Sequence, residues 1–210
     1  MRIAIFGATG GIGTYAVQHA LKKGYEVNAY VRDPAKFTIS HQNLNRYKGE
    51  INDYNNINKV LHNCDAVIWC VGIPMKKYEG TPSLDGHKLL FKAMKESNIT
   101  RFIDWSTPSV SFHKDTKSFI TVVPGILAGI AFNQSKQELL AIGELILSSD
   151  LKWTIVRFMA PKNTPYTGHV KVGFGDKKMN FQISREDIGA FMVEQVENEQ
   201  YIGSMPIIGS

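Results

Sequence analysis

The sequence IAIFGATGGIGTYAVQHAL, residues 3–21, decides the fold of this 210-residue chain. It opens with four apolar residues, which is typical of a buried parallel strand. Its second half is apolar at helical spacing until Gly24 interrupts the pattern. Gly7, Gly10 and Gly13 lie three residues apart between these two halves. The stretch therefore predicts a strand, a glycine-rich turn and a helix.

Three glycines in one turn need a reason, because each costs about 0.5–1 kcal/mol inside a regular element. The start of a helix carries unpaired N–H groups and a partial positive charge, so it binds phosphate groups. Glycine also lets the backbone approach such a ligand closely. A second apolar alternation follows at residues 27–31, as a βαβ unit requires. We therefore expect the turn to bind the diphosphate of a dinucleotide, the alternative being a glycine turn without a ligand.

Apolar segments of strand length alternate with helical patterns along most of the chain. Further strands are expected at 26–31, 45–48, 66–71, 101–104 and 153–156, and helices from about residue 53 and at 84–97 and 134–147. This alternation predicts an α/β fold, a Rossmann-like doubly wound parallel sheet with helices on both faces. No repeat or low-complexity linker interrupts it, so we expect residues 1–210 to form a single domain.

The C-terminal quarter departs from the alternation. Apolar residues alternate at 170–174 and 179–183 on either side of Gly175, which predicts a hairpin. A helix should follow, with Ser184 and Asp187 as its capping pair. We expect this hairpin and helix to lie on the substrate side, with residues 158–183 contributing the elements of a substrate pocket.

The segment 108–131 is too long for an ordinary connection. Segments of this length in compact domains commonly act as lids or binding loops. It follows an expected strand, and doubly wound sheets bind ligands outside the carboxyl ends of their strands. We expect it to border the substrate pocket; the alternatives are a dimer contact or an extra packed helix.

Composition and charge exclude several classes of protein. The chain is 43% hydrophobic, enough for a full core, and no run approaches the roughly 18 apolar residues of a membrane span. The net charge of +5 favours a polyanionic cofactor, but no basic stripe with interleaved aromatic residues predicts nucleic-acid binding. Cys64 and Cys70 lack metal-ligand spacing, so we expect neither a metal nor a disulfide. Because residues 1–6 lead directly into a strand, we expect no signal peptide and a cytoplasmic protein.

The end of the second strand bears on the choice between NADPH and NADH. An acidic residue there, about 20 residues after the glycines, commonly binds the ribose of NAD. Here Asp33 precedes Pro34, which suits a helix N-cap, so Arg32 is the first side chain to leave the strand. Its planar fork matches a 2′-phosphate. We expect NADPH; the alternatives are a surface ion pair of Arg32 with Asp33 or Glu50, and NADH if Asp33 holds the ribose.

Five stretches together resemble the atypical short-chain dehydrogenase/reductase group. They are residues 3–37, CDAVIWCVG (64–72), LKWTIVRF (151–158), TPYTG (164–168) and ISREDIGAFMVEQV (183–196). Within that group they are most similar to flavin reductase/biliverdin-IXβ reductase proteins and their NAD(P)-binding, NmrA-like relatives. The resemblance spans nearly the whole chain and implies an NAD(P)H-dependent oxidoreductase.

The resemblance also implies where a cofactor and a substrate would lie. It places the diphosphate nearest Gly7, Thr9, Gly10, Gly11 and Ile12, the 2′-phosphate at Arg32, the adenine at Glu50 and Ile51, and the cofactor ribose beside Cys70, Val71 and Gly72. Ser106 and Thr107 match a hydroxyl pair near the nicotinamide that orients substrate or relays a proton. Lys136 either binds a ribose hydroxyl or is a solvated helix residue.

Two departures from the family bear on catalysis. The histidine of biliverdin-reductase-like members is replaced near Ala160, and the nearest match to the Tyr-xxx-Lys motif of ordinary short-chain dehydrogenases has Phe132 in place of the tyrosine. A flavin or quinone can take its proton from water, so we expect hydride transfer to a flat conjugated small molecule. Trp105 and Phe112 either stack on that acceptor or belong to the core. The alternatives are a non-catalytic NmrA-like NAD(P) sensor and a sugar-nucleotide-type epimerase or isomerase; we expect a monomer or homodimer.

Overall fold

The computed structural model describes residues 1–74, 77–118 and 133–210. Its strands are β1 (Arg2–Phe6), β2 (Glu26–Val31), β3 (Leu44–Lys48), β4 (Ala66–Trp69), β5 (Arg101–Ser106), β6 (Lys152–Arg157), β7 (Pro161–Lys162), β8 (Lys171–Gly173), β9 (Ile183–Ser184) and β10 (Ile207–Gly209). Its helices are α1 (Gly13–Lys22), α2 (Tyr54–Val60), α3 (Pro82–Glu96), α5 (Asn133–Leu147) and α6 (Arg185–Glu194), with a short 3-10 helix η1 (Pro34–Lys36).

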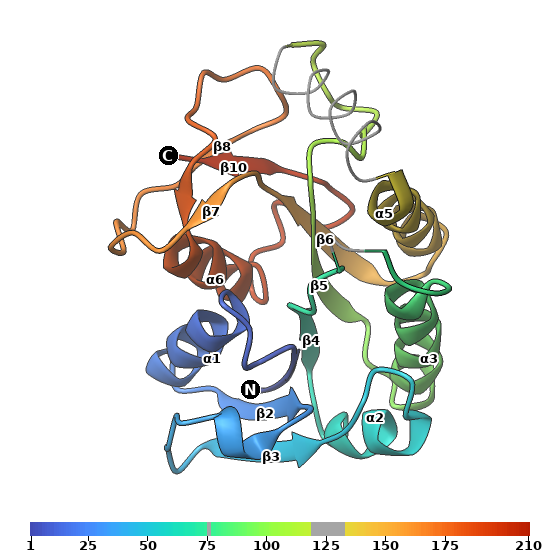
Figure 1. The fold of residues 1–210 in the computed structure, drawn as a ribbon. Helices are drawn as coiled ribbons and strands as arrows, with labels where there is room; N and C mark the ends of the chain where they lie inside the picture. Colours follow the sequence, from blue (N-terminus) through green and yellow to red (C-terminus); the bar gives the residue numbers. More distant parts are fainter. Residues whose placement is uncertain (75–76, 119–132) are drawn as a thin grey trace.

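Eight of the strands form one sheet in the order β3-β2-β1-β4-β5-β6-β10-β8. The pairings from β3 through to β10 are parallel, and β8 joins β10 in the antiparallel sense. Helices α1 and α6 cover one face of this sheet, whereas α2, α3 and α5 cover the other (Figure 1). These features confirm the predicted α/β fold with a doubly wound, mostly parallel sheet.

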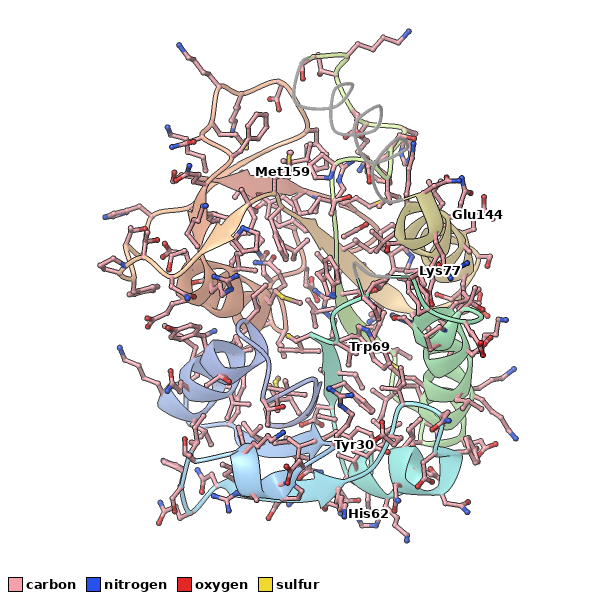
Figure 2. All side chains as sticks on the ribbon, viewed as in Figure 1. Tyr30, His62, Trp69, Lys77, Glu144 and Met159 are labelled. Carbon is pink, nitrogen blue, oxygen red and sulfur yellow. The ribbon has the colours of Figure 1, made fainter. Side chains whose placement is uncertain are left out.

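The core consists of two apolar layers, one on each face of the sheet. In β1, Ile3 and Ile5 face the layer under α1 and α6, whereas Phe6 faces the opposite layer. Figure 2 shows Trp69 at the carboxyl end of β4, on the α3 side, where its ring stacks on Phe6 at a centroid distance of 5.3 Å. Both faces of the central strands are therefore buried, which explains their continuous apolar sequences.

The predicted hairpin around Gly175 is wrong. Gly175 does turn the chain, with a φ of 86°, but the two segments beside it pair with other strands. β8 pairs with the C-terminal strand β10, and β9 pairs with β7. The last residues of the chain supply the partner for β8, so the local alternation identified extended segments but not the strands they pair with.

The start of the long segment 108–131 is anchored by a buried ion pair. Arg157 at the end of β6 is fully buried, and its Nη1 donates to Asp115 at 2.7 Å and to the Val110 carbonyl at 2.9 Å. Its Nε donates to the Met205 carbonyl at 2.8 Å. Residues 108–118 are thus held against the sheet, and the remainder of the expected lid, residues 119–131, lies outside the described residues. None of the helices in the described part combines the length and apolar character that a membrane crossing needs.

Replacing Asp115 by alanine should destabilise the protein strongly, because it leaves the buried Arg157 guanidinium without its carboxylate. Breaking a buried pair on one side costs about 3–5 kcal/mol. The free energy of unfolding from urea denaturation measures this loss. Asp150→Ala is the matched control: Asp150 is exposed and should change the free energy by less than about 0.5 kcal/mol. Equal losses for the two variants would contradict the anchoring role.

Candidate functional site

The side of the sheet to which successive strands are added changes between β1 and β4. From β1 the chain builds β2 and β3 on one side, whereas β4, β5 and β6 extend the sheet on the other. Open α/β sheets bind ligands outside the carboxyl strand ends at such a switch point. Gly7 follows β1 and Cys70 follows β4, and a Cβ added to Gly7 would lie 2.7 Å from the Cys70 carbonyl carbon. The two chain segments are therefore in direct backbone contact at the base of the switch point.

Two glycines of the turn are required by its own packing. Gly7 has a φ of 74°, in the left-handed region that favours glycine. A Cβ at Gly13 would lie 2.1 Å from the Gly7 carbonyl oxygen, so the start of α1 presses directly on the end of β1. Packing within the protein thus accounts for these two positions, which the sequence had suggested as signs of a ligand.

The start of α1 fits an anionic group. Ile12 is its N-cap and supplies no side-chain hydrogen bond, and no acidic residue lies in the first turn. Within the described residues, the N–H groups of Gly11, Ile12 and Gly13 donate to no acceptor. Helix starts are usually capped by a side chain, so these free donors leave a place for an oxygen-rich ligand. They lie within the predicted stretch, and they are the groups that could hold the diphosphate of a dinucleotide.

The end of β2 leaves Arg32 available. Asp33 caps η1 by accepting from the Ala35 N–H at 3.1 Å, and it pairs with Lys36 at 3.8 Å. Arg32 is exposed, and among the described residues it has no hydrogen bond and no ion pair. The alternative of a surface ion pair with Asp33 or Glu50 is therefore not what the structure contains, and the N-cap role predicted for Asp33 is confirmed.

The predicted adenine side lies after β3. The Tyr30 hydroxyl, from the side chain labelled in Figure 2, donates to the Glu50 carbonyl at 2.9 Å and fixes the chain there. The Glu50 side chain is exposed, whereas Ile51 is half-buried. Ile51 Cβ would lie 3.2 Å from a Cβ at Gly86, so it packs on α3. Ile51 is thus a half-buried apolar side chain beside α3, of the kind that could contact an adenine ring.

Trp105 is held in place between β4 and β6. Its indole N–H donates to the Val71 carbonyl at 3.0 Å, and its ring stacks on Phe158 at 5.8 Å. Phe112 is buried in the core, which confirms the core interpretation for that residue. Cys70 and Val71 are half-buried and Gly72 is exposed, so this strand end borders the switch point; Cys64 and Cys70 are free thiols.

The two predicted catalytic hydroxyls differ in their surroundings. Ser106, the last residue of β5, is 4% exposed, and its Oγ has no hydrogen-bond partner among the described residues. Thr107 is half-buried, and its Oγ1 lies 2.5 Å from the Ser109 Oγ. Buried hydroxyls normally have partners, so the free Ser106 Oγ is a group that a ligand or a water can satisfy.

A buried His–Asp pair joins α3 to the face of β5 that carries Ser106, and the sequence alone did not indicate it. Asp104 is two residues before Ser106, and its carboxylate lies 3.1 Å from His87 Nε2 on α3. His87 Nδ1 lies 2.6 Å from the Ser83 carbonyl, and both residues of the pair are almost fully buried. The available signal was Asp104, the single acidic residue in the strand sequence RFIDWS. The pair joins α3 to β5 two residues before Ser106, the first of the two predicted hydroxyl residues.

The start of α5 lies beside the loop that follows β4. The Ser135 hydroxyl donates to the Pro74 carbonyl at 2.8 Å, and Lys136 is half-buried in the same turn. This turn therefore adjoins the strand end predicted to contact the cofactor ribose. Phe132, the residue in place of the family tyrosine, lies outside the described residues. Ala160, near the place of the family histidine, is exposed, with a φ of 35°.

The predicted capping pair at α6 is half correct. Ser184 is the N-cap, and its hydroxyl oxygen accepts from the Glu186 N–H at 3.2 Å. Asp187 does not complete a capping box. Its buried carboxylate instead accepts from the N–H groups of Thr167 and Gly168, at 3.1 and 2.9 Å. Asp187 therefore anchors the TPYTG loop, a tertiary contact that its spacing from Ser184 does not reveal.

Replacing Gly7 by alanine should destabilise the protein more than the same change at Gly24. Both glycines have a left-handed φ, but a Cβ at Gly7 meets the Cys70 backbone, whereas nothing lies within 4 Å at Gly24. The left-handed conformation alone costs about 1–2 kcal/mol. The clash at Gly7 should add about 1–3 kcal/mol. Urea denaturation of both variants measures the difference, and equal losses would show that backbone packing does not determine the residue at this position.

Comparison with known proteins agrees with this geometry. Residues 7–199 match a family model described as NAD(P)H-binding. The anaerobillin reductase ChuY from Escherichia coli is 18% identical over 100% of this chain and 97% of its own, with a TM-score of 0.80. A short-chain dehydrogenase/reductase from Veillonella parvula, solved in complex with NADP, is 19% identical over 100% and 94%, with a TM-score of 0.76.

A third solved structure carries a different functional description. A putative epimerase from Bacteroides thetaiotaomicron is 21% identical over 99% of this chain and 96% of its own, with a TM-score of 0.81. At these identities the solved structures show the fold alone, whereas the family model spans most of the chain. The chain belongs to the NAD(P)H-binding family, in agreement with its predicted resemblance to dinucleotide-binding reductases.

Proposed function

We propose that this protein is an NADPH-dependent oxidoreductase that reduces a flat conjugated small molecule such as a flavin or quinone. The observation that carries the proposal is the arrangement of one edge of the sheet. The uncapped start of α1 follows β1. The Ser106 and Thr107 hydroxyls lie at the carboxyl end of β5, which is two strands away in the order β1-β4-β5. Two strand spacings are roughly 10 Å, a span suited to a dinucleotide that lies across the strand ends.

The groups at this edge of the sheet would bind different parts of the cofactor and the acceptor. The free N–H groups of Gly11 and Ile12 would bind the diphosphate, and Arg32 would bind the 2′-phosphate of NADPH. When bound, the reduced nicotinamide supplies a hydride. Ser106 and Thr107 would then orient the acceptor beside it through their hydroxyl groups. The protein's contribution is mainly proximity and orientation.

The choice of acceptor follows from the missing proton donor. Phe132 stands at the nearest match to the tyrosine of ordinary short-chain dehydrogenases, and Ala160 stands near the place of the histidine of biliverdin-reductase-like members. A ring that takes its proton from water needs neither group, whereas an alcohol dehydrogenase depends on such a donor. The neighbour described as an anaerobillin reductase and the neighbour solved with NADP support this interpretation. We also propose that residues 1–210 form a single domain.

Arg32→Ala should weaken NADPH binding by about 1.5–3 kcal/mol, because it removes hydrogen bonds to a charged phosphate. NADH lacks the 2′-phosphate, so its affinity should change much less. Isothermal titration calorimetry with each cofactor measures both dissociation constants. Lys36→Ala is the control for net charge, since Lys36 is an exposed cation four residues away. Equal losses for NADPH and NADH would refute the role of Arg32.

A turnover measurement tests the proposed reductase activity directly. NADPH oxidation with FMN or a quinone, followed by the absorbance of the reduced nicotinamide, should be measurable in the wild type. Thr107→Ala should lower kcat/KM roughly 10- to 100-fold, because a misplaced acceptor loses alignment with the nicotinamide. His113→Ala is the control, because its exposed side chain should leave turnover unchanged. Tight NADPH binding without oxidation by any acceptor would instead support an NmrA-like sensor.

A further inference from the structure

Arg185, the first residue of α6, lies against the glycine-rich turn. A Cβ at Gly11 would be 3.0 Å from both the Cδ and the Nε of Arg185. The missing side chain at residue 11 therefore makes room for the arginine. Backbone packing accounts for Gly7 and Gly13, and this contact supplies a reason of a different kind for the glycine at residue 11. A cation from the C-terminal part of the chain thus reaches the turn predicted to bind a diphosphate.

A close helix crossing brings Arg185 to this place. Gly189 lies one turn later on the same face of α6. A Cβ at Gly189 would be 2.8 Å from the Ala16 nitrogen and 3.1 Å from the Ile12 carbonyl oxygen. The absence of a side chain there lets the backbones of α6 and α1 approach at the start of α1. Arg185 is consequently held beside Gly11, whose N–H group donates to no acceptor in the described residues.

Most N–H donors of the Arg185 guanidinium have no acceptor in the described part of the chain. Its Nη1 donates to the Asn163 Oδ1 at 2.7 Å, which orients the planar fork. Within the ranges 1–74, 77–118 and 133–210 it has no carboxylate partner and no further hydrogen bond. The adjacent Glu186 pairs with His19 at 3.1 Å instead. The charge of Arg185 and four of its five N–H donors are therefore available to an anion.

We propose that Arg185 is a second cofactor-binding cation, which donates from its guanidinium to the diphosphate oxygens held at Gly11 and Ile12. The inference rests on the proposed binding of the dinucleotide at this turn. Arg32 would contact the 2′-phosphate, which only NADPH carries. Arg185 would contact the diphosphate, which NADPH, NADH and ADP-ribose share. The two arginines therefore have separable effects, one on cofactor choice and one on affinity for every dinucleotide.

The test compares Arg185→Gln with the wild type in binding three diphosphate ligands, NADPH, NADH and ADP-ribose. Each should bind roughly 10- to 100-fold more weakly, the range for lost hydrogen bonds to a charged group. Adenosine 2′-monophosphate has no diphosphate, so its affinity should be unchanged. Arg185→Lys keeps the charge and should recover part of the loss. Lys162→Ala removes a nearby exposed cation and should leave all four affinities within about twofold.

Three outcomes distinguish this inference from the proposed function. If the wild type binds the diphosphate ligands and Arg185→Gln binds them within twofold of it, the inference about Arg185 is overturned and the proposed function stands. A variant that loses adenosine 2′-monophosphate to the same extent, or whose urea midpoint falls, shows a structural role and also overturns the inference. A wild type that binds none of the ligands overturns the proposed function itself.

Discussion

Direct backbone contact at the carboxyl ends of β1 and β4 is the constraint on which the rest of the structure depends. Gly7 adjoins the Cys70 backbone, and Gly13 adjoins the carbonyl of Gly7, so no side chain fits at either glycine. This contact holds the start of α1 directly against the carboxyl end of β1, beside the switch point. The candidate binding site therefore arises from close packing within the protein, and a bound cofactor would meet donors already positioned by the fold.

Buried arginines fix the C-terminal half of the chain on this frame. Arg157 joins Asp115 and the Met205 carbonyl, and Arg101 donates to the Gln195 and Val196 carbonyls at the end of α6. Desolvation lowers the pKa of Arg101 to about 10, which still leaves it charged at neutral pH. A cation there complements the free carbonyls of the helix end. Ser184 caps the start of α6 and Arg101 binds the carbonyls at its end, so both ends of the helix that carries Arg185 are hydrogen-bonded.

The proposed mechanism relies on positioning rather than on a proton donor. In the proposed arrangement, free N–H groups and two arginines would surround the phosphates, whereas the Ser106 and Thr107 hydroxyls would lie at the nicotinamide end. The unpartnered Ser106 Oγ and the buried His87–Asp104 pair below it are the polar groups closest to that role. This distribution suits an acceptor that receives a hydride and is then protonated by water.

Local sequence determined the elements that depend on periodicity and on turn chemistry. The strand 26–31, the N-cap at Asp33 and the alternation of strands and helices as far as β6 follow from nearest neighbours along the chain, and the structure confirms them. Tertiary structure alone decided which distant segments meet. It paired β8 with the C-terminal strand β10, joined Asp187 to the TPYTG loop, and brought Arg185 to Gly11. Such contacts depend on how helices and strands pack in three dimensions, and residue spacing along the chain carries no record of that packing.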